Sequence, residues 1–255
     1  MSFEYLTAGQ AIAAKGLRMV VVGNVPSPWS EAAKGFFHIK RIPFSAVRLA
    51  YDDEALKSWA GQLSAPVVVY EDETPRSGWA EILMLAERLA PPALLPLQPE
   101  ARGQALLLAD KLCSPGGLGW MRRLQQVHAS LTGNGGFPDR IAGYLGKKYG
   151  YDPSEGETYG IRVRRLLGEL AGALREQHAA GKSYYLGDTL SATDVYSATF
   201  MALFKPLPDS QCRMHPAIRP AFEMLDAETA AALDPLLIEH RDMMYSRHLE
   251  LPLAL

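Results

Sequence analysis

The stretch Val25–Ser30 holds the residue with the clearest chemical potential in this chain, Ser27. The apolar run Met19–Val22 precedes it and Pro28 follows it, which predicts a buried strand, a tight turn and a helix that begins on a serine. N–H groups and the dipole at a helix N-terminus favour negative charge. The sequence therefore predicts a site for an anionic sulfur at Ser27, although the same residues also fit an ordinary helix cap.

Strand and helix signals alternate around Ser27, and these elements must position it. Buried strands are expected at 19–22, 45–49 and 66–70, and helices at 28–40, 53–61 and 79–89. Such alternation predicts an α/β layer with a largely hydrophobic sheet. Pro66 adjoins the third strand, so it is expected at a strand start or in a special turn.

A proline-rich connector at 90–96 marks a domain boundary, because every element expected after it is helical. Helices are predicted at 102–112, 120–131 and 161–178. We therefore expect an N-terminal extension at 1–17, an α/β domain at 18–90, a linker at 91–99 and an all-helical domain at 100–255.

The segment Leu186–Phe204 is the most specific local signal. Ser191 and Asp194 stand in capping-box register, and Leu190 and Val195 stand where a hydrophobic staple places its two residues. The helix that follows is apolar almost all round, which predicts a buried helix at the centre of the second domain. The motif is expected to be structural rather than catalytic.

Bulk composition narrows the class of protein. A formal net charge of −2 gives no field that attracts a phosphate backbone, so a nucleic-acid partner is not expected. The apolar runs are too short for a bilayer span, and no signal-peptide pattern is visible, so no membrane partner is expected.

The two cysteines, Cys113 and Cys212, form no CxxC motif, which favours a reducing cytoplasm. The histidines show no metal-ligand spacing, so no metal site is predicted.

Three of these segments together resemble the cytosolic glutathione transferases. They are Ser27–Ser30 with the following Lys40–Phe44, Ala65–Val68, and the capping-box segment Leu186–Asp194. The resemblance implies a thioredoxin-like N-terminal domain joined to an all-helical C-terminal domain. It places Ser27 at the position of the active-site serine of zeta- and theta-like classes and of the cysteine of omega-like ones.

The resemblance also implies a set of site residues and a co-substrate, glutathione. Ser27 is the implied catalytic residue, and a cis proline is implied at Pro66. The implied glutathione-binding residues are Ser27, Trp29, Ala65, Pro66, Ser77, Gly78 and Trp79. A small hydrophobic electrophile as second substrate and a homodimer are implied in the same way. Trp120–Arg123 and Tyr144 are candidates for the wall of the hydrophobic pocket, or simply for core packing and solvated charge.

The chemistry expected of Ser27 is hydrogen-bond donation to a thiolate. A charge-assisted hydrogen bond contributes about 1.5–3 kcal/mol and a helix N-terminus about 0.3–1 kcal/mol. At about 1.36 kcal/mol per pKa unit, together they lower a thiol pKa near 8.5 by roughly 1.5–3 units. That shift produces thiolate at neutral pH.

One segment departs from the family pattern. Where the family places an acidic or amide residue and then a serine, this chain has Ser77 and Gly78 in the sequence Arg76–Trp79. The ammonium of glutathione then lacks its usual partner, while the helix N-terminus can still bind the ligand carboxylate. The main alternative is a non-catalytic binding or scaffolding protein of this fold that has lost the glutathione site. A specialised isomerase or dehalogenase is a further alternative without a separate sequence signal.

Overall fold

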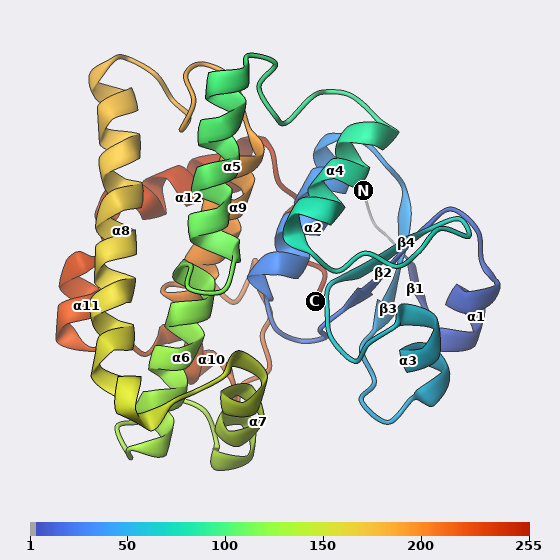
Figure 1. The fold of residues 1–255 in the computed structure, drawn as a ribbon, viewed down its shortest axis with the longest axis horizontal. Helices are drawn as coiled ribbons and strands as arrows, with labels where there is room; N and C mark the ends of the chain where they lie inside the picture. Colours follow the sequence, from blue (N-terminus) through green and yellow to red (C-terminus); the bar gives the residue numbers. More distant parts are fainter. Residues whose placement is uncertain (1–3) are drawn as a thin grey trace.

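An α/β layer and a helical layer lie side by side in this protein (Figure 1). The structure is a computed structural model, and it describes residues 4–255. The elements of the α/β layer are β1 (Glu4–Leu6), α1 (Ala8–Ala13), β2 (Leu17–Val21), α2 (Pro28–Ile39), β3 (Phe44–Arg48), α3 (Glu54–Ala60), β4 (Val67–Tyr70) and α4 (Trp79–Leu89). The predicted strands and helices of this layer are confirmed.

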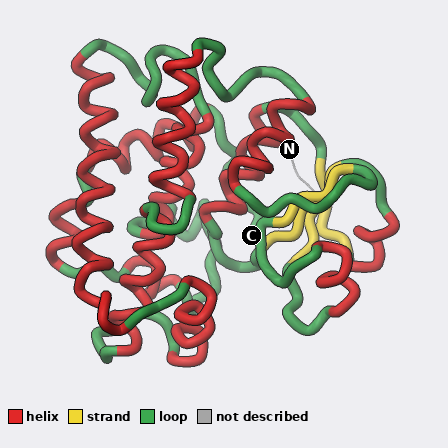
Figure 2. Tube along the Cα trace, viewed as in Figure 1, coloured by secondary structure: helices red, strands yellow, loops and turns green. Residues whose placement is uncertain are grey.

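The four strands form one sheet in the order β1-β3-β2-β4. β2 pairs parallel to β3 and antiparallel to β4, while β1 pairs parallel to β3 at the edge. Helices α2 and α4 cover one face of the sheet and α1 and α3 the other, as the ribbon and the Cα trace show from the same side (Figures 1 and 2). Because both faces are covered, β2 is buried along its whole length, which explains its continuous apolar sequence.

The first residues of the chain take part in this sheet. Glu4, Tyr5 and Leu6 pair with Ser45, Ala46 and Val47 of β3. The sequence analysis predicts no strand or helix before Met19. β1 has only three residues and α1 only six, and elements this short give no clear apolar pattern. The domain boundaries at 17 and 90 stay predictions.

The helical layer begins after the proline-rich connector. Its helices are α5 (Pro99–Cys113), α6 (Leu118–Leu131), α7 (Asp139–Tyr149), α8 (Gly156–Ala179), α9 (Ala192–Phe200), α10 (Arg219–Glu223), α11 (Ala227–Ala232) and α12 (Pro235–Arg247), with 3-10 turns η1 (Pro153–Glu155) and η2 (Met201–Leu203). Between residues 4 and 255, no helix is both long enough and apolar enough to span a bilayer. The fold class, a thioredoxin-like domain followed by an all-helical domain, is confirmed.

The two layers share one hydrophobic core. Helix α2 packs against α9, with Trp29 against Phe200 and Phe36 against Tyr196, each pair of ring centroids 5.0 Å apart in an edge-to-face arrangement. The first turn of α6 adds to this contact, because the Cβ position of Gly119 lies 2.4 Å from the Phe200 ring. The start of α2 is therefore held directly on the buried centre of the helical domain.

The predicted capping box at the start of α9 is confirmed. The Asp194 carboxylate accepts hydrogen bonds from the Ser191 N–H at 2.9 Å and from the Ser191 hydroxyl at 2.6 Å. It also accepts the Tyr185 N–H at 3.0 Å, and His240 Nε2 lies 3.2 Å away. Asp194 is wholly buried, so this single carboxylate fixes α9 and ties it to α12.

Candidate functional site

Ser27 occupies the N-cap position of α2, directly after the turn that follows β2. Its backbone is extended, and its C=O accepts the Glu31 N–H at 2.8 Å, so the helix begins where the sequence predicts. The side chain makes no capping hydrogen bond, and the residue is 9% exposed. The backbone of Ser27 therefore starts the helix as an ordinary cap does, while its hydroxyl caps no N–H.

The bond between Ala65 and Pro66 is cis, as the resemblance implies. β4 starts at Val67, which pairs with Val20 of β2, so Ala65 lies just outside the ladder. Within residues 4–255 the backbone N–H and C=O of Ala65 make no backbone hydrogen bond. This short stretch is therefore free to pair with an extended peptide.

The start of α4 is brought beside β4 by a local bridge. Arg76 exchanges backbone hydrogen bonds of 2.8 and 2.9 Å with Val68, which returns the chain to the sheet. The Arg76 guanidinium is paired with Glu73 at 2.7 Å. The next residue, Ser77, is exposed, and Gly78 is the N-cap of α4.

A carboxylate of the chain itself occupies the N-terminus of α4. Glu81 Oε2 accepts the N–H of Gly78 at 2.9 Å. This is the helix end that the sequence predicts for the carboxylate of the ligand. A bound carboxylate at this N–H must therefore replace Glu81.

Trp79 spans the interface between the two layers. Its indole N–H donates to Ser114 Oγ at 2.9 Å, and its ring meets the Tyr196 ring edge-on at 5.8 Å. The Tyr196 hydroxyl in turn donates to the Trp79 carbonyl at 2.9 Å. These contacts fix the indole against the helical layer.

A hollow of about 10 Å³ remains between these side chains. Of the seven predicted site residues, four line it: Trp29, Pro66, Ser77 and Trp79, together with Ala33, Phe36, Ile82 and Tyr196. Ser27, Ala65 and Gly78 are outside its lining. A volume of this kind is about what a single water molecule needs, so the free protein leaves no room here for a larger ligand.

Trp29 and Cys113 are structural neighbours. The Trp29 indole N–H donates to the Cys113 carbonyl at 3.0 Å, and the ring packs on Phe200. Burial raises the pKa of the Cys113 thiol well above its ordinary value. A buried thiol with a raised pKa is a poor nucleophile, so Cys113 serves packing rather than chemistry.

Helix α7 reaches across to the α/β layer next to Ala65. Lys148 Nζ donates to Ser64 Oγ at 2.9 Å, and the Tyr144 ring meets the Tyr51 ring at 5.5 Å. Burial and the nearby charge of Arg123 lower the pKa of Lys148. Tyr144 therefore contacts the α/β layer through Tyr51, and its place in the wall of a hydrophobic pocket stays a prediction.

The Trp120–Arg123 segment on α6 packs within the helical layer. The Trp120 indole N–H donates to the Tyr149 carbonyl at 2.9 Å. Arg122 is buried and donates to the Leu203 carbonyl and to Gln125. Burial lowers the pKa of its guanidinium to about 9. These contacts favour the core-packing interpretation for Arg122.

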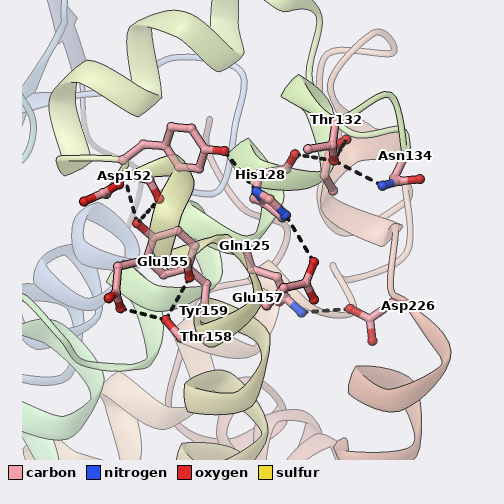
Figure 3. A network of polar contacts seen from close by, with 12 residues as sticks. Gln125, His128, Thr132, Asn134, Asp152, Glu155, Glu157, Thr158, Tyr159 and Asp226 are labelled. Atoms are coloured by element: carbon pink, nitrogen blue, oxygen red, sulfur yellow. Dashed lines mark hydrogen bonds and ion pairs between the residues drawn. The ribbon is translucent and has the colours of Figure 1, made fainter.

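A polar cluster outside the proposed site lies where α6, η1 and α8 meet (Figure 3). His128 Nδ1 lies 2.9 Å from the Tyr151 hydroxyl, and Nε2 lies 3.7 Å from Glu157, whose side chain is 97% exposed. Gln125 connects α6 to Asp226 at 2.8 Å. No cavity borders these groups among the pockets described, and their contacts connect α6 to Tyr151, to α8 and to the start of α11, so the cluster is structural.

Sequence reasoning missed two residues that shape the site. Glu81 follows Gly78 by three residues, which is the spacing of a side chain that returns to the helix start, so this contact was available from the sequence. The contact of Tyr196 with Trp79 joins residues 117 positions apart, and no local pattern signals it.

Solved structures of the same architecture are glutathione transferases. A glutathione transferase family member from Pseudomonas fluorescens Pf-5, solved with two glutathione molecules bound, matches with a TM-score of 0.61 at 15% identity, covering 94% of each chain. A glutathione S-transferase from Methylobacillus flagellatus, solved with glutathione bound, gives 0.61 at 15% identity over 91% of this chain and 95% of its own. One from Methylobacterium radiotolerans, in complex with glutathione sulfonate, gives 0.58 at 18% identity over 91% of each chain.

No protein-family model and no curated protein matches the sequence. At this level of identity the structural matches define the fold, so the chain has the fold of the cytosolic glutathione transferases. The resemblance drawn from the three sequence segments is thus confirmed for the architecture.

Proposed function

We propose that this protein binds glutathione at the start of α2 and that the Ser27 hydroxyl donates a hydrogen bond to the sulfur. The thiol proton passes to solvent, and the thiolate attacks a small hydrophobic electrophile, whose leaving group departs with the bonding electrons. The observation that supports this proposal is the Ser27 hydroxyl, which caps no N–H although it stands at a helix N-terminus. Glutathione bound in structures of the same fold supports the choice of thiol.

Ala65 has a role in the same proposal. Its unpaired N–H and C=O, next to the cis proline, pair with the backbone of the tripeptide as an added strand. The γ-glutamyl carboxylate binds the N–H of Gly78 once Glu81 has left it. Glutathione binding is therefore opposed by a contact that already exists in the free protein.

Replacement of Glu81 tests this competition. Glu81→Gln keeps the size of the side chain and removes the negative charge that competes for the Gly78 N–H, so glutathione binds several-fold more tightly than to the unmodified protein. Isothermal titration calorimetry measures the change. Glu176→Gln is the matched control, because Glu176 is exposed on α8, and it leaves the affinity unchanged. Equal affinities of all three proteins contradict the proposed position of the γ-glutamyl carboxylate.

A non-catalytic protein of this fold is the second candidate, and one observation favours it. The hollow beside Pro66 and Trp79 measures about 10 Å³, far less than a tripeptide needs. If millimolar glutathione produces neither heat nor a thermal shift, even with Glu81→Gln, the second candidate holds and the first fails. Assembly as a homodimer and a cytoplasmic location stay predictions.

A further inference from the structure

Ser30, in the first turn of α2, carries a buried hydroxyl that makes no hydrogen bond to the rest of the chain. The residue is 1% exposed, and within residues 4–255 its Oγ atom has no hydrogen-bond partner. Most buried polar side chains in native proteins are hydrogen-bonded, because a buried donor without a partner destabilises the fold. The position of this hydroxyl in the fold therefore has to account for it.

The usual partners of a helical serine are not used. A serine inside a helix commonly donates its hydroxyl to a carbonyl one turn earlier, as Ser130 does to the Gln126 carbonyl at 2.7 Å. For Ser30 these carbonyls belong to Pro26 and Ser27, and no bond from its hydroxyl to either is found in the described part of the chain. Ser30 therefore does not support α2 in the way that an ordinary helical serine does.

Ser30 shares the first turn of α2 with Ser27. Ser27 is the N-cap, Pro28 and Trp29 follow, and Ser30 is the third residue of the helix. A helical side chain leans toward the N-terminus of its helix, and the third helical position is the one from which a side chain reaches back to the N-cap residue. The Ser27 side chain caps no N–H. Two hydroxyls that take no part in capping therefore lie within one turn of each other.

The two hydroxyls can act in series. A hydroxyl donates one hydrogen and accepts through its lone pairs. When Ser27 donates its hydrogen to a sulfur anion, its oxygen is left as an acceptor, and rotation about the Cα–Cβ bond of Ser30 brings the second hydroxyl toward it. Hydrogen bonds in such a chain polarise one another, so the bond to the sulfur becomes stronger.

We infer that Ser30 is a positioning residue, whose hydroxyl donates a hydrogen bond to Ser27 Oγ when a thiolate is bound. This bond directs the Ser27 hydrogen toward the sulfur, and Ser30 itself does not touch the ligand. Its burial fits this role, because the neighbouring Trp29 and Ala33 line the hollow beside Pro66 and Ser30 does not. The inference rests on the proposed function of Ser27.

A pair of cysteines tests the juxtaposition without any ligand. When Ser27→Cys is combined with Ser30→Cys, oxidation with diamide is expected to form a disulfide between positions 27 and 30, because such a bond forms only where two Cβ atoms are close. Mass spectrometry detects the loss of two hydrogen atoms from the peptide. Ser27→Cys combined with Ser58→Cys is the matched control, because Ser58 is exposed on α3 across the sheet, and it forms no disulfide. Free thiols at both 27 and 30 after oxidation overturn the inference.

The pKa of the bound thiol measures the effect on the chemistry. Ser30→Ala is expected to raise this pKa by about 0.5–1 unit, the contribution of one neutral hydrogen bond, and Ser27→Ala to raise it further. Because Ser30 acts only through Ser27, adding Ser30→Ala to Ser27→Ala has no additional effect. Ser58→Ala leaves the thiol pKa unchanged.

Thermal melting separates this role from a structural one. Since no hydrogen bond of the Ser30 hydroxyl is found between residues 4 and 255, Ser30→Ala is expected to leave the melting temperature unchanged or to raise it. A lower melting temperature, or a thiol pKa that Ser27→Ala raises and Ser30→Ala does not, overturns the inference and leaves the proposed function standing. If Ser27→Ala itself leaves the thiol pKa unchanged, the proposed function fails and the role of Ser30 fails with it.

Discussion

Two side chains of the proposed site have opposite effects on an anion. Ser27 offers an unused hydroxyl at the start of one helix, which favours an anion. Glu81 places a carboxylate on the N–H at the start of another helix, which excludes one. Each arrangement follows from local sequence: a serine before a proline in the first case, and a glutamate three residues after the N-cap in the second.

Gly119 is a residue on which the junction of the two layers depends. A Cβ there lies 2.4 Å from the Phe200 ring and 2.9 Å from the Trp29 ring. Gly119→Ala is therefore expected to lower the free energy of unfolding by about 1–3 kcal/mol through overpacking. Urea denaturation measures the loss.

Gly103 provides the control for this prediction. It lies within α5 and a Cβ there meets nothing within 4 Å, so Gly103→Ala stabilises the protein by up to about 1 kcal/mol. The same effect of both variants on stability contradicts the close packing of Gly119.

Among the secondary-structure elements, two helix caps are expected to contribute very different amounts to stability. Asp194 holds the start of α9 with two bonds to Ser191, accepts the Tyr185 N–H and lies 3.2 Å from His240 Nε2, all within the core. Asp194→Ala leaves these buried donors without partners and is expected to cost at least about 3 kcal/mol of stability.

Asp53 caps α3 through one bond to the Leu56 N–H at 2.8 Å. Asp53→Ala is expected to cost only about 1 kcal/mol, the ordinary loss of an N-cap. Urea titration of both variants compares them, and equal losses contradict the central position given to Asp194.

His248, directly after α12, makes the stability of the fold depend on pH. Burial lowers the pKa of its imidazole below the ordinary value of 6.5. The charges of Arg247 and His240 also lower this pKa, and the charge of Asp194 opposes them. A lowered folded-state pKa means that the stability is present above about pH 6.5 and is lost as the pH falls through the folded-state pKa.

His248→Gln keeps a polar partner for the Tyr184 hydroxyl, which lies 2.8 Å from Nε2, and does not titrate. The variant is expected to lose less stability than the unmodified protein between about pH 7.5 and about pH 5.5. Urea denaturation at the two pH values measures the difference, and identical losses exclude His248 as a source of the pH dependence.

For the molecule as a whole, the sequence predicts the elements of the two layers better than the side-chain contacts between the layers. The strands, α2, α4 and the capping box have local signals, namely apolar runs, Pro28 after Ser27, and the spacing of Ser191 and Asp194. These signals suffice for the fold class.

The side-chain contacts that hold the two layers together around the site have no such local signal. It depends on Trp79 with Ser114, on Tyr196 with Trp79 and on Lys148 with Ser64, pairs that are 35, 117 and 84 residues apart. Each pair joins side chains that only the packed domains bring together, so no periodicity within one element reveals them.

The titration of the thiol of glutathione in the presence of the protein tests the central claim most directly. Thiolate formation is followed by its ultraviolet absorbance as a function of pH, with the unmodified protein and with Ser27→Ala. The account predicts a thiol pKa about 1.5–3 units below that of free glutathione with Ser27 present, and a return toward the free value in Ser27→Ala. An identical titration curve for both proteins contradicts it.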